Sequence, residues 1–129
     1  MGETASAKDR KGNLNMKLDK GLVGGSTVLL VLTLLAEKDY YGYEIIKTLE
    51  ERSDKTFEFK EGSLYPVLHR MENEGFVVSY REKSESGKER KYYHITPMGL
   101  EQLGEEKAQW VVFSRAVNKV TLGAEFGLA

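Results

Sequence analysis

The sequence of 129 residues contains no cysteine, only two histidines and only two prolines. The absence of cysteine excludes a disulfide framework, a thiol nucleophile and a cysteine-ligated zinc site, and it fits a reducing compartment. The two histidines form no metal-ligand motif, and the glycine-rich segment GLVGGST lacks the lysine of a phosphate-binding loop. We therefore expect a protein that is not an enzyme and that holds no metal and no cofactor.

The sequence also lacks a hydrophobic run long enough to cross a membrane. Its most apolar stretch, residues 22–36, includes two glycines and several hydroxyl side chains, whereas a membrane span needs roughly 20 predominantly apolar residues. The stretch is apolar on nearly every side, so we predict a buried central helix. The N-terminus has no apolar signal-peptide core, and we expect a cytoplasmic protein without membrane contact.

Neither positive nor negative charge is in large excess. The sequence has 19 Lys and Arg residues and 20 Asp and Glu residues, for a net charge of -1. The chain as a whole therefore does not attract polyanions, and any binding to nucleic acid must come from a local basic surface. A hydrophobic share of 40% with 30% charged residues is typical of a soluble globular domain.

Hydrophobic periodicity predicts three helices, then a β-hairpin, then a last helix. The expected elements are a polar tail over residues 1–20, helices over 22–36, 43–52 and 63–74, strands over 76–83 and 90–96, and a helix that Thr96 caps and Pro97 opens. Three compact helices followed by a two-stranded ribbon is the plan of a winged helix-turn-helix. We expect a mainly α fold with a β-hairpin: a winged-helix DNA-binding domain over residues 21–96, and a long C-terminal dimerisation helix and tail over residues 97–129.

The helix expected over residues 63–74 contains a proline, which constrains where it begins. With Ser63 as the N-cap, Pro66 is the third helical residue, where no intrahelical N–H is needed. One face of this helix is apolar, and it carries Leu64, Val67, Leu68 and Met71. The other side holds compact hydrogen-bonding groups, Ser63, Tyr65, His69 and Arg70, instead of the usual Glu and Lys.

A helix that presents its first turns to DNA requires such a face. Its N–H groups meet phosphate and its side chains reach base edges. The hairpin adds Lys88, Arg90 and Lys91 against one acid, Glu89, and a basic ribbon tip suits phosphates or the minor groove. On pattern alone, a solvated helix face and a solvated turn remain the alternatives.

Three motifs together resemble the PadR family of transcriptional regulators. They are YGYEI (residues 41–45), SLYPVLHRMENEG (residues 63–75) and RKYYHIT (residues 90–96), and the resemblance covers about residues 20–122. It implies a dimeric winged-helix repressor that binds double-stranded DNA with its third helix in the major groove. The DNA-binding positions that it implies are Ser63, Tyr65, Pro66, His69 and Arg70 in the helix and Lys88, Arg90 and Lys91 in the wing.

The last helix carries a narrow apolar stripe in which Leu103, Trp110, Phe113, Val117, Val120 and Ala124 follow steps of seven, three, four, three and four, with Glu106 as a break. Such a stripe packs on its own domain or pairs with a second copy, and a homodimer fits a pseudo-palindromic operator. In some multidrug-sensing relatives an aromatic residue at this place lines a pocket for flat apolar compounds. Trp110 and Phe113 are therefore candidates for binding a small aromatic or phenolic effector, although filling the dimer seam is the favoured interpretation.

The rival function is a winged-helix module that binds protein without binding DNA. The near-neutral net charge leaves this alternative open. The basic hairpin tip favours DNA, because a protein-binding wing more often exposes apolar residues.

Overall fold

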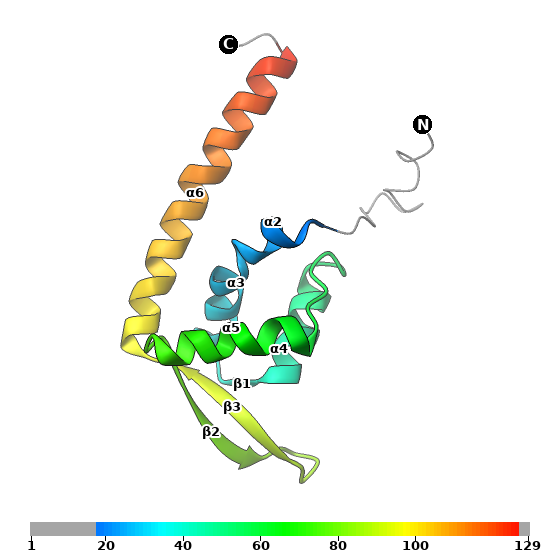
Figure 1. Cartoon of the computed structure of the whole chain (residues 1–129), viewed down its shortest axis with the longest axis vertical. Coiled ribbons are helices and arrows are strands. Elements are labelled where there is room, and N and C mark those ends of the chain that lie inside the picture. The colour runs from blue at the N-terminus through cyan, green and yellow to red at the C-terminus, as the bar shows by residue number, and fades with distance from the viewer. Residues whose placement is uncertain (1–17, 127–129) are drawn as a thin grey trace.

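The computed structural model describes residues 18–126, so most of the expected polar tail lies outside the described residues (Figure 1). The helices are α2 (Lys20–Gly24), α3 (Thr27–Leu35), α4 (Gly42–Arg52), α5 (Glu61–Asn73) and α6 (Pro97–Phe126). The strands are β1 (Tyr40–Tyr41), β2 (Val77–Lys83) and β3 (Glu89–Ile95). The order of helices, hairpin and final helix confirms the expected architecture. In the described part of the chain, no helix is long and apolar enough to span a membrane.

The core lies where α3, α4 and α5 meet the sheet. Leu32 and Ile45 are completely buried there. The predicted apolar face of the third helix is confirmed, since Leu64 and Leu68 are completely buried and Met71 is 1% exposed. This packing turns the opposite face of α5 outward, and that face carries the residues predicted to bind DNA.

The apolar stretch over residues 22–36 forms two helices and not the single helix predicted. A turn at Gly25 and Ser26 separates α2 from α3. Consecutive glycines lower helix stability, and Gly25 caps the end of α2. Only α3 contributes buried side chains, whereas Leu22 of α2 is 63% exposed.

The sheet has a third strand that the sequence did not predict. β1 pairs antiparallel with β3, with Tyr40 opposite Tyr93 and Tyr41 opposite Tyr92, so the strand order is β1-β3-β2. A strand of two residues is too short to show an alternating pattern. The pairing fixes the start of α4 against the hairpin of β2 and β3, which we call the wing.

The predicted N-cap of the third helix is wrong, because α5 begins at Glu61 with Lys60 as its cap. The Ser63 hydroxyl accepts a hydrogen bond from the Lys60 N–H at 3.2 Å and donates one to the Lys60 carbonyl at 3.0 Å. Pro66 is therefore the sixth helical residue, and the Gly62 carbonyl lacks its usual N–H partner. Gly62 and Pro66 are both exposed, so water can supply the missing hydrogen bond.

The last helix, α6, runs without interruption from Pro97 and extends well beyond the remaining elements (Figure 1). The Thr96 hydroxyl caps its start by accepting from the Gly99 N–H at 3.0 Å, and it donates to the Gly75 carbonyl at 2.6 Å. These bonds attach the first turn of α6 to the segment between α5 and β2. The outer part of α6 is left without covering from the described residues of its own chain.

Candidate nucleic-acid interface

An open groove of about 510 Å³ lies between α5, the start of α4 and the wing. Tyr65 and His69 line it from α5, and Arg90 and Lys91 line it from β3, together with residues 41–43. The structure thus brings four of the predicted DNA-binding residues to one site. Three carboxylates also line the groove: Glu61, Glu72 and Glu89.

Tyr65 is only 40% exposed, so it is less accessible than a residue on a free helix face. Its ring lies against the backbone of Gly42, the first residue of α4. Burial raises the pKa of the Tyr65 hydroxyl, and the Glu61 carboxylate raises it further, while Arg90 acts in the opposite direction. The hydroxyl is therefore neutral at physiological pH and can both donate and accept a hydrogen bond.

Arg90 is held over an aromatic ring. Its guanidinium carbon lies 4.8 Å from the centre of the Tyr41 ring, within the range of a cation–π interaction. Its Nε atom is buried and has no hydrogen-bond partner among the described residues. A buried charged donor without an acceptor is costly, so this site favours a ligand that supplies an oxygen atom.

The base of the wing is fixed by Asp39, a residue that sequence reasoning missed. Its carboxylate accepts a hydrogen bond from the Tyr80 hydroxyl at 2.6 Å and lies 2.8 Å from His94 Nδ1. Burial acts to raise the pKa of Asp39, but the bonds to Tyr80 and His94 hold it below its ordinary value. The same carboxylate raises the pKa of Tyr80 to about 12. Tyr80 and His94 lie 41 and 55 positions away from Asp39 in the chain, so no local sequence pattern predicts these contacts.

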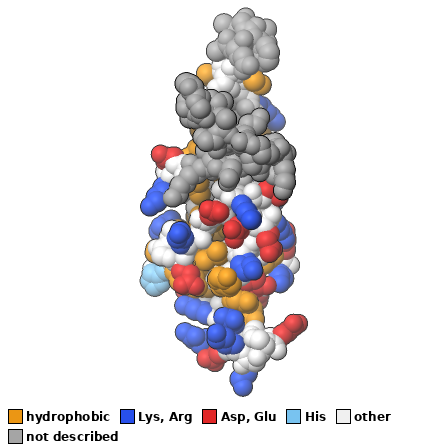
Figure 2. Space-filling view, turned by 90° about the vertical axis from the view of Figure 1, so that its right-hand side faces the viewer, with side chains coloured by type: hydrophobic (Ala, Val, Ile, Leu, Met, Phe, Trp, Pro, Cys, Tyr) orange, Lys and Arg blue, Asp and Glu red, His pale blue; other side chains and the backbone are white. Residues whose placement is uncertain are grey.

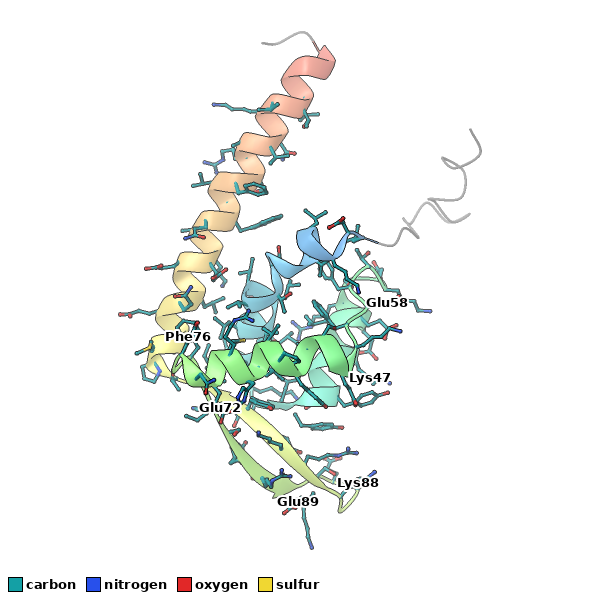
Figure 3. All side chains as sticks on the ribbon, in the orientation of Figure 1. Lys47, Glu58, Glu72, Phe76, Lys88 and Glu89 are labelled. Atoms are coloured by element: carbon teal, nitrogen blue, oxygen red, sulfur yellow. The ribbon has the colours of Figure 1, made fainter. Side chains whose placement is uncertain are left out.

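A second contact joins the wing to α5. The Ser79 hydroxyl of β2 donates to the Glu72 carboxylate at 2.7 Å, and Figure 3 shows Glu72 on α5 above the start of the wing. This bond holds one of the three acids of the groove. The wing is therefore joined to α5 by a side-chain hydrogen bond beside the groove.

The remaining predicted DNA-binding residues lie on the outside of the two elements. Ser63, Pro66 and Arg70 are exposed on α5. Lys88 is exposed at the wing tip, where Figure 3 labels it. Gly87 makes the tip turn possible, because its φ of 86° is one that residues with a side chain rarely adopt. In Figure 2, Lys and Arg side chains gather at the lower end of the molecule, over the wing. The assignment of these side chains to DNA stays a prediction.

The structure separates the residues assigned to the stripe of the last helix. Leu103 is 6% exposed and belongs to the core of its own chain, so its assignment to a dimer interface is corrected. Trp110, Phe113, Val117 and Val120 are 49%, 58%, 40% and 71% exposed. The Trp110 and Phe113 rings lie 6.3 Å apart between centres. Ala124 lies outside the residues whose side chains are described.

A family model for the PadR-like transcriptional regulators matches residues 31–105, more than half of the chain. The chain belongs to this family. Members of the family are transcription factors that bind DNA and are not enzymes, which confirms the expected class of function. The match spans α4, α5 and the wing, which are the elements that line the groove.

Solved structures of similar proteins have the same fold. A transcriptional regulator from Clostridium thermocellum is 34% identical, covers 78% of this chain and 97% of its own, and superposes with a TM-score of 0.71. A PadR-like regulator from Bacillus cereus is 35% identical over 79% of this chain and 97% of its own, also with a TM-score of 0.71. The transcriptional regulator YqjI of Escherichia coli is 28% identical over 78% of this chain, which spans 46% of YqjI.

Proposed function

We propose that this PadR-like regulator is a homodimeric repressor of a pseudo-palindromic operator in double-stranded DNA. The first turns of α5, as the recognition helix, enter the major groove, and the wing contacts the flanking backbone. The residues that we assign to DNA are Ser63, Tyr65, Pro66, His69 and Arg70 of α5 and Lys88, Arg90 and Lys91 of the wing.

The observation that carries this proposal is the convergence of α5 and the wing at one groove. Tyr65 and His69 present hydrogen-bonding groups there, beside the cations of Arg90 and Lys91. A phosphate oxygen supplies the acceptor that the buried Arg90 Nε lacks among the described residues. The bonds from Asp39 and Ser79 support a wing that meets the duplex in a fixed orientation.

The exposed stripe of α6 supports the dimer. Trp110, Phe113, Val117 and Val120 recur at alternating steps of three and four, which is the spacing of a coiled-coil seam. Two chains paired along this stripe carry two recognition helices, and half-sites roughly 34 Å apart would then be read together.

A titration of promoter DNA over a salt series, followed by fluorescence anisotropy, tests DNA binding. Each protomer offers four assigned basic groups, Arg70, Lys88, Arg90 and Lys91. A dimer therefore neutralises at most about eight phosphates, and we expect the affinity to fall with a log–log slope no steeper than about -7. A flat salt response, or no binding, would favour the protein-binding module.

Two substitutions separate specific from general contacts. Tyr65→Ala should weaken specific binding by about 1–3 kcal/mol, because Tyr65 reaches a base or positions the helix that does. Lys88→Ala should weaken binding to all sequences about equally and should make the salt slope shallower by about one unit. Equal specific affinity of Tyr65→Ala and the parent protein would refute the recognition-helix assignment.

The exposed pair of Trp110 and Phe113 supports a second role for the seam. A small aromatic or phenolic compound that binds between these rings and the partner helix would shift the two DNA-binding heads by differential binding. Trp110 is the only tryptophan, so quenching of its fluorescence reports such a compound directly. Unchanged fluorescence and unchanged DNA affinity across a panel of aromatic compounds would contradict the effector.

A further inference from the structure

Two consecutive residues at the junction of β1 and α4 touch both parts of the interface. Tyr41 ends β1 and Gly42 begins α4, and both line the groove. Gly42 contacts Tyr65 of α5, while Tyr41 contacts Arg90 of the wing. This junction is therefore the place where helix and wing share a common support.

A glycine is needed at position 42 because of the adjacent Tyr65 ring and not because of the backbone conformation there. The described glycines with positive φ are Gly75 and Gly87, so an alanine fits the backbone at position 42. A Cβ atom there would stand 2.5 Å from Cε1, 2.9 Å from the hydroxyl and 3.0 Å from Cζ of Tyr65. Those distances are too short for contact, so the Tyr65 ring keeps its place only because residue 42 has no side chain.

Tyr41 holds the wing side of the groove. The pairing of β1 with β3 sets Tyr41 opposite Tyr92, and their rings meet edge to face with centres 5.5 Å apart. The same Tyr41 ring carries the Arg90 guanidinium at 4.8 Å. Arg90 and Tyr92 are two residues apart on β3 and so share one face of the strand, which places cation and ring together on Tyr41.

We propose that Tyr41 and Gly42 are positioning residues for DNA binding. Gly42 leaves room for the ring of Tyr65 on the recognition helix, and Tyr41 holds Arg90 of the wing through its ring. One junction thus sets the positions of Tyr65 and Arg90 relative to each other. The inference rests on the proposed function, because it assumes that Tyr65 and Arg90 meet DNA.

A double-mutant cycle tests the Gly42 contact. The Kd for promoter DNA at one salt concentration, and the thermal midpoint, are measured for Gly42→Ala, Tyr65→Ala and the double variant. We expect Gly42→Ala to bind roughly tenfold more weakly, in the range of one lost contact. In the Tyr65→Ala background the same change should cost nothing, because the ring that alanine displaces is gone.

The choice of substitution controls for a loss of folding. Alanine favours a helix more than glycine does, so the thermal midpoint of Gly42→Ala should not fall in the Tyr65→Ala background. Gly24→Ala is the matched control, since among the described residues no atom outside its own helix lies within 4 Å of the Cβ position there, and it should bind as the parent does.

The outcomes distinguish this inference from the proposed function. If Tyr65→Ala weakens binding but Gly42→Ala does not, the positioning role of Gly42 is refuted and the recognition helix stands. Equal losses from Gly42→Ala with and without Tyr65 refute it as well. If Tyr65→Ala binds as the parent does, the recognition-helix assignment and this inference fail together.

The contact between Tyr41 and Arg90 is tested separately, by measuring affinity for DNA of any sequence. Tyr41→Leu should reduce affinity several-fold, Tyr41→Phe should restore it because the aromatic face remains, and the loss should vanish in an Arg90→Ala background. Equal losses for Tyr41→Leu and Tyr41→Phe, or a loss that persists without Arg90, overturn the role of the ring.

Discussion

The apolar stripe on α6 gives the sharpest test of the dimer, through substitution of Phe113. A buried phenylalanine removes roughly 150–250 Å² from water, and Phe113 is 58% exposed in the single chain. About 120 Å² per protomer is therefore available to a partner, worth about 3 kcal/mol at roughly 25 cal/mol per Å². Alanine keeps part of this area, so Phe113→Ala should cost about 2 kcal/mol per protomer.

A symmetric dimer buries the same residue twice, so the cost of Phe113→Ala doubles to about 4 kcal/mol, or roughly a thousandfold in the dimer dissociation constant. Sedimentation velocity over a dilution series measures that constant. Val112 is the matched control, since it is 68% exposed but lies off the stripe, and Val112→Ala should change dimer affinity by less than about 0.5 kcal/mol. A parent protein that stays monomeric at all concentrations, or an unchanged constant for Phe113→Ala, refutes pairing along this face.

Two further predictions concern how the wing and α6 are attached to the helical body. Asp39→Asn should lower the thermal midpoint at neutral pH, because the carboxylate accepts hydrogen bonds from β2 and β3. Since folding lowers the pKa of Asp39, its contribution is full above the unfolded pKa of about 4 and is lost as the pH falls through the folded value; a difference between parent and variant that grows in acid would contradict this. Gly99→Ala should cost at least about 1–3 kcal/mol in urea unfolding, because its Cβ would overlap the Phe76 carbonyl oxygen. At Gly104, no atom of the described residues outside its own helix lies within 4 Å of the Cβ position. Gly104→Ala should therefore be neutral or slightly stabilising, and equal stabilities for the two variants would refute the steric argument.

Periodic features of the chain were predictable from the sequence, because burial imposes them locally. The spacing of Leu64, Leu68 and Met71 gave both the helix and its buried face. The alternation in the wing likewise gave its two strands, and Thr96 with Pro97 gave the start of α6. In each of these cases the signal lies within one element and repeats.

Features that depend on distant partners were not predictable in this way. β1 is a strand only because β3 lies beside it, and the role of Asp39 requires partners on both strands of the wing. The start of α5 was misplaced because a proline inside a helix is tolerated where water can replace the lost bond, and that condition depends on exposure. The glycines at positions 24 and 25 divided the first apolar stretch although its hydrophobic pattern continues.

The charge distribution gives a physical reason for the proposed positioning of Tyr65 and Arg90. Non-specific affinity for DNA scales with the number of phosphates that a surface neutralises, and here Arg90 and Lys91 share the groove with three glutamates. These carboxylates offset part of the attraction that the neighbouring basic side chains exert on phosphate. If Tyr65 and Arg90 contact DNA as proposed, specific affinity depends on contacts made in register, and such contacts require that the two side chains be fixed relative to each other before the duplex binds. The contacts of Tyr41, Gly42 and Asp39 meet that requirement without adding positive charge.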